Sequence, residues 1–488
     1  MLKSVSFENY KCFKARTTIE LAPLTLLCGV NSSGKSSIIN SLLMLKQSYE
    51  NSAIENKMEL NGKYIKSGSF DDIIFKGENG KITFQTCYEL AAPPRGGIKK
   101  SKNDITAFKT LAKMFAGVVD NITSFVVSTK TVIDKMADSK QINNNILDEQ
   151  IIEIKANSNE NVMSTTSIIL RHNQDKKYRI EVQNMPHEGR IESKVIFYDC
   201  ACYFEGFKLV NAFANGVEPR VDNFGGILAD IYLIFSLNSM QYRSIHYLNP
   251  LREYPKMNYN IDNEINSVGL GGEYAPHLIY LNQNKRINGF FPPNEDGEFF
   301  VQEKKIDFKN CVQNWMEYLG FGHYLLEKKS QTLNMLIDNY NIINVGFGIS
   351  QVLPIIAEGL LLEGRETLLL EQPEIHLHPK AQMCMADFLL ATAINSRNVI
   401  VETHSDHIIN RVIRRMMENP QVYNKVKILF VDQNEEGESF IEEVKIDPVK
   451  GALIENENFF YQFADETEKI IAAGYRNKKN AQESRMEE

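Results

Sequence analysis

Residues 29–36 read GVNSSGKS and fit the pattern G-x-x-x-x-G-K-[ST] in full. In such a loop two glycines let backbone N–H groups curl around phosphates, the lysine reaches the β- and γ-phosphates, and the final hydroxyl binds Mg²⁺. The candidate nucleotide-binding residues are Gly29, Asn31, Ser32, Ser33, Gly34, Lys35, Ser36 and Ser37. This pattern predicts a site for ATP and Mg²⁺.

A second candidate site is TLLLEQPEIHLHP at residues 367–379. An apolar strand that ends in Glu371 would bring a carboxylate to the water shell of Mg²⁺. Gln372 stands where a general base is expected, and an amide can hold a water but cannot take its proton. Glu374 follows across one proline and could reach that water, or Glu371 could serve both purposes. Because a general base contributes about 10²- to 10⁴-fold, we expect slow hydrolysis.

A third stretch, NVGFGISQVLP at residues 344–354, combines glycines with polar residues at the start of a predicted helix. Gly346, Gly348, Ser350 and Gln351 would form a second anion-binding helix N-terminus. Two such edges for one nucleotide, if they face away from each other within a subunit, can meet only across a dimer. His404 precedes a good pair of helix N-cap residues and is a further candidate.

Two histidines, His376 and His378, alternate with Glu374 and allow a metal site as one interpretation. The sequence offers no further ligand cluster nearby, so a loop that contacts a second subunit is the favoured interpretation.

Several arginines also allow two interpretations. Arg252 could contact the nucleotide or a neighbouring subunit, or form a surface salt bridge. Arg411, Arg414 and Arg415 share one face of a predicted helix, which could contact DNA or simply be solvated.

Composition limits the class of protein. The chain has 488 residues, of which 43% are hydrophobic and 24% charged, so most of it should fold. A net charge of −8 argues against a general electrostatic grip on nucleic acid, and any DNA contact must be local. Seven cysteines without a paired framework indicate a reducing, cytoplasmic location. The N-terminus lacks the apolar core of a signal peptide, and the longest apolar stretch, residues 227–237, carries Asp230, so we expect no membrane association.

The predicted elements suit these sites. Strands are expected at 5–8, 17–21 and 24–28, with a helix directly after the glycine loop. From residue 351 helices and strands alternate, which is typical of a parallel α/β sheet. The predicted elements are a helix at 351–362, a strand at 366–371, a helix at 379–395, a strand at 398–402, a helix at 405–418 and a strand at 426–431.

The middle of the chain is expected to be inserted. Apolar residues at three- and four-residue steps over 105–136 predict a long amphipathic helix, which packs against residues 145–154 or projects as a partner-binding arm. Runs within 166–210 look like strands. The predicted domains are a head at 1–92 and 240–465, a helical, coiled-coil-like arm at 93–160, a β-rich and helical insertion at 161–239, and a charged tail at 466–488.

The order of the motifs resembles that of ABC-type ATPases of the SMC, RecF and OLD class. The phosphate loop corresponds to Walker A, GFGISQ to the signature, LLLEQPEIHLHP to Walker B with the D-loop, and VIVETHSDH to the H-loop. The start FENYKCF is similar to the N-F-K-S-F start of that class. YLNPLREYP and VGLGGE resemble the lid of AAA-type bacterial ATPases of the anti-phage-defence type, whose Walker B reads E-Q-P-E.

This resemblance implies an α/β fold: an ABC-type P-loop NTPase head with a parallel sheet core, an antiparallel β subdomain and an inserted helical arm. It implies that Lys35 and Ser36 bind phosphate and Mg²⁺, and that Glu371 is the metal-side acid. Ser350 would cap the γ-phosphate of the opposite subunit's ATP. His404 would be the γ-phosphate switch. The catalytic set is then Glu371, Gln372, Glu374 and His404, with Ser36 and Glu371 at the metal.

The expected function is an ATPase that closes into an ATP-sandwich dimer, within a homo-oligomer, and acts as sensor or scaffold for a separate effector protein in anti-phage defence. One alternative is a DNA-repair or recombination ATPase of the SMC or RecF type. Another is an OLD-like nuclease, which is disfavoured because the segment after His404 is short and lacks a clear D-x-D with a partner glutamate.

Overall fold

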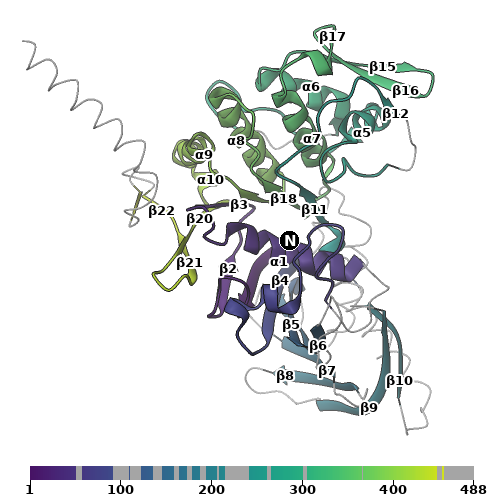
Figure 1. The fold of residues 1–488 in the computed structure, drawn as a ribbon, viewed down its shortest axis with the longest axis vertical. Coiled ribbons are helices and arrows are strands. Elements are labelled where there is room, and N and C mark those ends of the chain that lie inside the picture. Colours follow the sequence, from purple (N-terminus) through teal and green to yellow (C-terminus); the bar gives the residue numbers. More distant parts are fainter. Residues whose placement is uncertain are drawn as a thin grey trace, which may run out of the picture.

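A six-stranded sheet of mostly parallel strands carries the phosphate loop near its centre (Figure 1). In the computed structural model its strand order is β11-β18-β19-β3-β20-β21, and every neighbouring pair except β20–β21 is parallel. These strands are β3 (Leu24–Gly29), β11 (Ile245–Leu248), β18 (Thr367–Glu371), β19 (Asn398–Glu402), β20 (Val426–Gln433) and β21 (Ser439–Glu443). Segments from both ends of the chain therefore share one sheet.

The structure describes residues 1–50, 58–91, 109, 122–135, 145–158, 164–172, 178–186, 194–205, 208–214, 241–260, 265–299, 305–364, 366–447 and 453–454.

The parallel strands are buried on both faces, which explains their continuous apolar sequences. In β3, Leu26 packs into one hydrophobic core and Leu27 into a second core on the opposite face. In β18 the neighbours Leu368 and Leu369 divide between the same two cores. The predicted α/β alternation after residue 351 is confirmed, with every boundary within three residues of the observed one.

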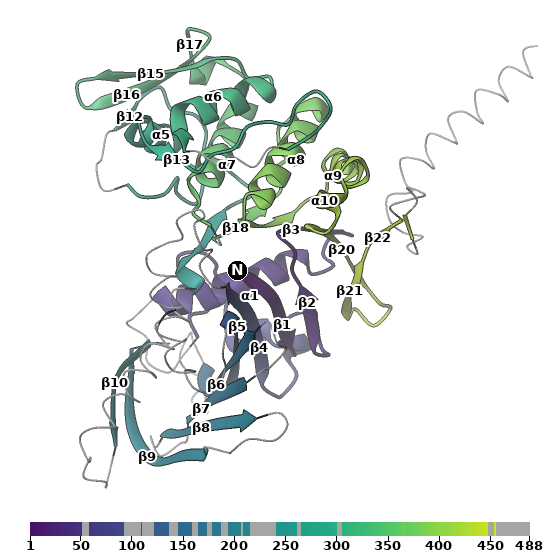
Figure 2. The same ribbon diagram turned by 180° about the vertical axis from the view of Figure 1, so that it is seen from behind.

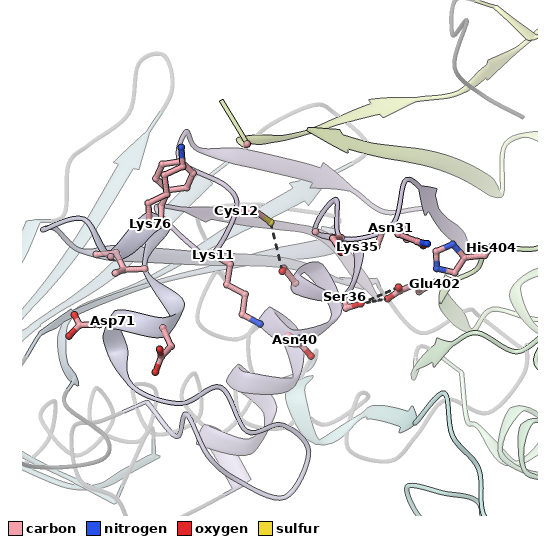
Figure 3. Close-up of a pocket in the computed structure, with 18 residues that line it drawn as sticks. Lys11, Cys12, Asn31, Lys35, Ser36, Asn40, Asp71, Lys76, Glu402 and His404 are labelled. Atoms are coloured by element: carbon pink, nitrogen blue, oxygen red, sulfur yellow. Dashed lines mark hydrogen bonds between the residues drawn. The ribbon is translucent and has the colours of Figure 1, made fainter. Parts of the chain in front are cut away.

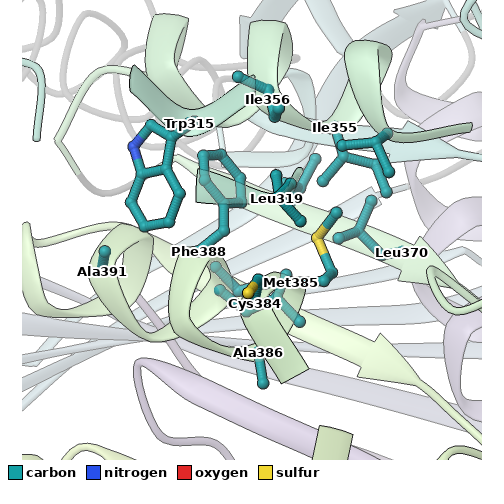
Figure 4. Packing of buried hydrophobic residues seen from close by; sticks show 14 of the residues in the cluster. Trp315, Leu319, Ile355, Ile356, Leu370, Cys384, Met385, Ala386, Phe388 and Ala391 are labelled. Carbon is teal, nitrogen blue, oxygen red and sulfur yellow. The ribbon is translucent and has the colours of Figure 1, made fainter. Parts of the chain in front are cut away.

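The first core lies under a layer of helices on one face of the sheet. These helices are α5 (Ala275–Asn282), α6 (Phe308–Tyr318), α7 (Gly348–Leu361), α8 (Pro379–Ile394) and α9 (Asp406–Glu418). Trp315 of α6 packs edge-on against Phe388 of α8, with ring centroids 4.9 Å apart, and its indole N–H donates to the Phe290 carbonyl at 3.0 Å (Figure 4). The only tryptophan of the chain therefore joins two helices of this layer.

The second core is built around α1 (Lys35–Glu50), the helix that follows the phosphate loop. This helix lies between the parallel sheet and a nine-stranded antiparallel sheet (Figures 1 and 2). The order in that second sheet is β10-β9-β8-β7-β6-β5-β4-β1-β2. Its strands are β1 (Leu2–Glu8), β2 (Thr17–Glu20), β4 (Ile82–Ala91), β5 (Ile122–Lys135), β6 (Asn145–Ser158), β7 (Ser164–His172), β8 (Tyr178–Pro186), β9 (Lys194–Glu205) and β10 (Lys208–Ala214).

The predicted helical arm at 93–160 is wrong where the structure describes it. Residues 122–135 and 145–158 are the antiparallel strands β5 and β6, and they extend the sheet of the N-terminal strands. Along β5 burial alternates, with Phe125 and Val127 buried and Val126 less so, until a register shift between Val132 and Ile133. That shift breaks the two-residue period, and several β-branched residues favour a strand. The earlier part of the expected helix lies outside the described residues, apart from Lys109.

Smaller elements complete the described parts. A four-stranded sheet is formed by β12 (Tyr259–Asn260), β15 (Tyr324–Lys329), β16 (Thr332–Ile337) and β17 (Tyr340–Asn341). The remaining elements are α2 (Phe70–Ile73), η1 (Phe75–Gly77), β13 (Arg286–Ile287), β14 (Ile306–Asp307), η2 (Ile342–Asn344), α10 (Pro420–Tyr423), β22 (Lys445–Ile446) and β23 (Leu453–Ile454). Among the helices that the structure describes, none has both the length and the apolar character needed to cross a membrane. The expected charged tail at 466–488 lies outside the described residues.

Candidate functional site

The phosphate loop connects β3 to α1, as the sequence predicts. Gly29 and Gly34 have φ values of 133° and 105°, which L side chains rarely adopt. A Cβ on Gly29 would collide with the Val431 carbonyl oxygen, and a Cβ on Gly34 would approach the Cys12 sulfur to 2.5 Å. Both glycines are therefore required by the backbone path and by close neighbours. The loop ends at the N-terminus of α1, where unpaired N–H groups favour anions.

The loop is held from the side by the β20–β21 hairpin. The Ser439 hydroxyl donates to the Ser33 carbonyl at 2.6 Å, and the Gln433 side chain donates to the Ser32 carbonyl at 3.3 Å. The backbone N–H of Ser439 also donates to the Cys12 carbonyl at 2.8 Å. One strand of the hairpin thus positions both the phosphate loop and the turn that follows β1.

Lys35 is buried and folds back over the loop. Its ammonium donates to the carbonyls of Gly29 and Val30 at 3.1 and 2.6 Å. Burial lowers the pKa of Lys35, while the nearby Glu402 opposes this shift. The lysine therefore lies against the phosphate loop.

A pocket of about 740 Å³ opens over this loop (Figure 3). At one end Asn31, Ser36, Glu402 and His404 lie close together, whereas Lys11 and Asp71 lie away from them. The lining residues are Lys11, Cys12, Asn31, Ser32, Gly34, Lys35, Ser36, Ser37, Asn40, Asp71, Asp72, Ile74, Phe75, Lys76, Gly77, Glu402, His404 and Gly437. The pocket is large enough for a nucleotide.

The carboxylate next to Ser36 is that of Glu402, which is not among the site residues predicted from the sequence. The Ser36 hydroxyl lies 3.1 and 2.9 Å from the two carboxylate oxygens of Glu402 (Figure 3). Burial raises the pKa of Glu402 to about 6, and repulsion from Glu371 and Glu374 acts in the same direction, while the Ser36 hydrogen bond opposes it. The available signal was an acid at the end of a predicted strand, directly before Thr403 and His404.

Glu371 ends β18 as predicted, but its carboxylate is held on the side away from the loop. The Tyr247 hydroxyl donates to it at 2.5 Å, and Arg252 donates to the Glu371 carbonyl at 3.2 Å. Burial raises the pKa of Glu371. Among the described residues, Glu402 lines the pocket over the phosphate loop and Glu371 does not. The hydrogen bonds of the Glu371 carboxylate thus do not include Ser36, where the metal-side acid was expected.

Gln372 adopts a left-handed backbone conformation with φ of 46°. Its backbone N–H donates to the Glu402 carbonyl at 2.7 Å. This bond joins the end of β18 to the end of β19, so Gln372 sits directly beside the acid that contacts Ser36.

Glu374 ties the segment after β18 to the end of β19. One carboxylate oxygen accepts the backbone N–H of His404 at 2.7 Å, and the other accepts the Thr403 hydroxyl at 2.9 Å. Burial raises the pKa of Glu374, and these hydrogen bonds oppose the shift. Both oxygens are therefore engaged, which disfavours the expected role of Glu374 as a replacement base.

His404 lines the pocket and is exposed. Partial desolvation of its ring lowers the pKa of His404, and the positive charge of Lys35 adds to this effect. The next residue, Ser405, caps α9 by accepting the backbone N–H of Ile408 at 3.1 Å. A predicted N-cap thus fixes the chain directly after the histidine.

The expected signature residues begin α7, away from the phosphate loop. The Ser350 hydroxyl donates to the Phe347 carbonyl at 2.7 Å. Within the described part of the chain, Gly346, Gly348, Ser350 and Gln351 do not line the pocket over the loop. The two predicted phosphate-binding edges are thus separate within one chain.

The two histidines after Glu374 have different neighbours. The ring of His376 lies 4.7 Å from that of Phe347, next to the start of α7, and His378 caps α8 by accepting the Lys380 backbone N–H at 3.3 Å. No group of three or more histidine, cysteine or acidic residues among the described residues is arranged to hold a metal ion. These contacts give no support to the metal-site interpretation.

The arginines of α9 belong mainly to the interior. Arg411 and Arg415 each donate at 2.8 Å to the fully buried carboxylate of Asp387, and Arg414 pairs with Glu418 at 2.6 Å. Neither a DNA contact nor a solvated face, the two interpretations of the sequence, holds for Arg411 and Arg415, because both form an ion pair between α8 and α9.

Arg252 is buried, so a surface salt bridge is excluded. Its Nε and Nη1 atoms have no hydrogen-bond partner among the described residues. Burial lowers the pKa of Arg252 to about 10, opposed by the negative charges of Glu374 and Glu371. The guanidinium therefore supplies positive charge beside Glu371 and Glu374.

Comparison with known proteins gives one family and several structural similarities. Among solved structures, the chain is similar to an SMC head domain from Thermotoga maritima, with 11% sequence identity and a TM-score of 0.34, covering 91% of this chain and 99% of that chain. It is also similar to an SmcHead bound to the C-winged helix domain of ScpA, with 11% identity and a TM-score of 0.37, covering 92% of this chain and 98% of that chain.

A third similar structure is an Smc head domain with an extended coiled coil, bound to the C-terminal domain of ScpA derived from Pyrococcus furiosus. The identity is 10% and the TM-score 0.35, and the similarity covers 91% of this chain and 96% of that chain. No curated protein matches the sequence. Residues 1–409 match the AAA ATPase domain family AAA_15. Because this match spans most of the 488 residues, the chain belongs to the AAA ATPase domain family.

Proposed function

We propose that this chain binds ATP with Mg²⁺ in the pocket over residues 29–36 and hydrolyses it slowly. One observation carries the proposal: Lys35, Ser36 and Glu402 line the same pocket at the N-terminus of α1. A helix N-terminus, a lysine and a glycine loop suit the triphosphate. The pocket volume of about 740 Å³ also leaves room for a nucleoside beyond the phosphates.

The residues present fit Mg²⁺. Ser36 and Glu402 offer a hydroxyl and a carboxylate that lie 2.9 Å apart, and Mg²⁺ prefers oxygen ligands from one or two carboxylates together with substrate phosphates. Bound Mg²⁺ would neutralise charge that develops on the phosphates. Lys35 would leave the Gly29 and Val30 carbonyls to contact phosphate, and the loop N–H groups would hold the remaining oxygens.

Slow hydrolysis follows from the residues beside the expected position of the water. Gln372 has an amide where a carboxylate would act as a base, and both carboxylate oxygens of Glu374 are already hydrogen-bonded to Thr403 and His404. Without a positioned base a factor of about 10²–10⁴ in rate is lost. ATP would therefore stay bound long enough to keep the protein in its ATP-bound conformation.

A dimer is supported by the separation of the two phosphate-binding edges. Ser350 and Gly348 start α7 beside His376, and not over the pocket of their own chain. A second copy could place its α7 N-terminus over the ATP of the first. We infer a homo-oligomer built from such ATP-sandwich dimers, in which ATP favours the closed form.

The wider role proposed is that of an ATP-controlled sensor or scaffold for a separate effector protein in the cytoplasm, in anti-phage defence. The resemblance of the E-Q-P-E segment and of YLNPLREYP to ATPases of that type supports it. An action on DNA is less well supported, because Arg411 and Arg415 are bound to Asp387.

Native mass measurement of the full chain tests this proposal, with and without ATP and Mg²⁺. We expect ATP to shift the wild type toward dimers or multiples of dimers, and the Lys35→Ala variant to show no shift. Isothermal titration with ATP on the same samples reports binding separately. A wild type that binds no ATP would refute the proposed site. A wild type that binds ATP without any shift toward dimers would refute the ATP-dependent dimer.

A further inference from the structure

We propose that Glu402, and not Glu371, is the carboxylate that shares the Mg²⁺ of the bound nucleotide with Ser36. This inference rests on the proposed binding of ATP with Mg²⁺. It departs from the expectation that the acid at the end of the 367–371 strand is the metal-side residue.

The strand order places the backbone of Glu402 nearer to the phosphate loop than that of Glu371. β19 is the direct neighbour of β3, with Glu402 in register with Leu27, whereas β18 lies on the far side of β19. Neighbouring strands are about 4.8 Å apart, so the backbone of Glu371 starts one strand spacing farther from the loop. The side chain that contacts Ser36 in the structure is that of Glu402, on the strand next to β3.

The hydrogen bonds also favour Glu402 over Glu371 as the metal ligand. Both carboxylate oxygens of Glu402 lie within 3.1 Å of the Ser36 hydroxyl, and Glu402 is only 5% exposed. The Glu371 carboxylate instead accepts the hydroxyl of Tyr247 at 2.5 Å. A cation between the Ser36 and Glu402 oxygens would need little rearrangement, whereas Glu371 would first have to leave its tyrosine.

The local charge also favours a cation beside Glu402. Glu371 and Glu374 lie near enough to repel Glu402. The nearby basic groups do not bind its carboxylate: Lys35 donates to backbone carbonyls, and Arg252 donates to the Glu371 carbonyl. Among the hydrogen bonds of the described residues, the Glu402 carboxylate accepts only from Ser36. One carboxylate, one hydroxyl and phosphate oxygens form the kind of mixed shell that Mg²⁺ takes.

A simpler explanation is that the Ser36–Glu402 hydrogen bond only closes the loop onto β19. Glu402→Gln separates the two explanations, because the amide oxygen can still accept the Ser36 hydroxyl while the negative charge is lost. Removing that charge also removes repulsion of the phosphates. Metal-free nucleotide should therefore bind the variant at least as tightly as the wild type.

The test is equilibrium binding of a fluorescent ATP analogue to the full chain, measured in Mg²⁺ and in EDTA. The wild type should bind more tightly in Mg²⁺. For Glu402→Gln we expect the ratio of the affinity in Mg²⁺ to the affinity in EDTA to fall roughly 10- to 100-fold. The affinity in EDTA should not fall. Glu371→Gln should keep the gain within about twofold, a difference of ~0.4 kcal/mol. Ser36→Ala combined with Glu402→Gln should lose little more than either change alone, since both ligands hold one ion.

Other outcomes overturn the inference. If Mg²⁺ increases the nucleotide affinity of Glu402→Gln as much as that of the wild type, or no longer increases that of Glu371→Gln, Glu371 and not Glu402 is the metal ligand. A wild-type affinity that does not depend on Mg²⁺ would also overturn it while leaving nucleotide binding intact. Absence of analogue binding to the wild type under both conditions, with Lys35→Ala as the matched control, would instead reject the proposed function itself. Titration of Mn²⁺ by electron paramagnetic resonance, with the nucleotide present, checks the result without fluorescence.

Discussion

The Glu374 carboxylate accepts the backbone N–H of His404 at 2.7 Å and so joins the segment after β18 to the end of β19. Its second oxygen accepts the Thr403 hydroxyl. A residue that the motif suggested for catalysis therefore holds the histidine in place.

Replacing Glu374 tests this structural role. Glu374→Ala would leave the His404 N–H without its acceptor, and we expect the free energy of unfolding to fall by about 1–3 kcal/mol. Glu374→Gln should cost less, because the amide oxygen can still accept one bond. Urea denaturation measures both variants, and Glu435→Ala, at an exposed position, is the control. Equal stability of wild type and Glu374→Ala would refute the assignment.

Gln372 is expected to limit turnover. Gln372→Glu keeps the side-chain shape at a position with φ of 46° but adds a carboxylate that can take a proton. We expect the rate of phosphate release at saturating ATP and Mg²⁺ to rise roughly tenfold or more. Gln372→Ala is the matched control and should not raise the rate. No acceleration in Gln372→Glu would show that the missing base does not limit hydrolysis.

His246 on β11 predicts a pH-dependent contribution to stability. Its ring lies 2.5 Å from a carboxylate oxygen of Glu358 on α7 and 3.5 Å from Glu366. Burial alone would lower the pKa of His246, but these hydrogen bonds raise it to about 9. Since the unfolded value is near 6.5, the stabilisation is complete below about pH 6.5 and is lost as the pH rises through about 9.

The measurement is the free energy of unfolding of the wild type and of His246→Gln between pH 6 and pH 10. We expect a difference of about 2 kcal/mol at the acidic end, which shrinks as the pH rises. His323→Gln, at an exposed histidine, should change little. A difference that does not depend on pH would mean that the ring is neutral in the folded protein.

The arginines of α9 provide a direct comparison on one helix. Arg415 donates to the fully buried Asp387, whereas Arg414 makes an exposed pair with Glu418. We expect Arg415→Ala to lower the free energy of unfolding by about 2–3 kcal/mol, because the buried Asp387 carboxylate loses one of its two arginine partners and keeps Arg411. Arg414→Ala should cost less than about 1 kcal/mol. Thermal unfolding measures both, and equal effects would contradict the interior role of Arg415.

The sequence was sufficient for features that depend on neighbouring residues. The strand, glycine loop and helix at the phosphate site follow from spacing over a short stretch, and so do the helices and strands from residue 351 onward, where apolar periodicity agrees with strong caps such as Ser405. The prediction for β5 was wrong, because the buried face of this strand also carries the polar residues Thr129 and Thr131, so its apolar residues show no clear two-residue period.

The acid beside Ser36 could not be found in this way. Its identity depends on which strand lies next to β3, and that order is decided by packing between residues hundreds of positions apart. Local patterns place Glu371 and Glu402 alike at the ends of strands. Sequence alone thus determined that a phosphate loop and acid-ended parallel strands exist. Only the tertiary structure decided that Glu402 lies at the loop, since this depends on the pairing of β19 with β3.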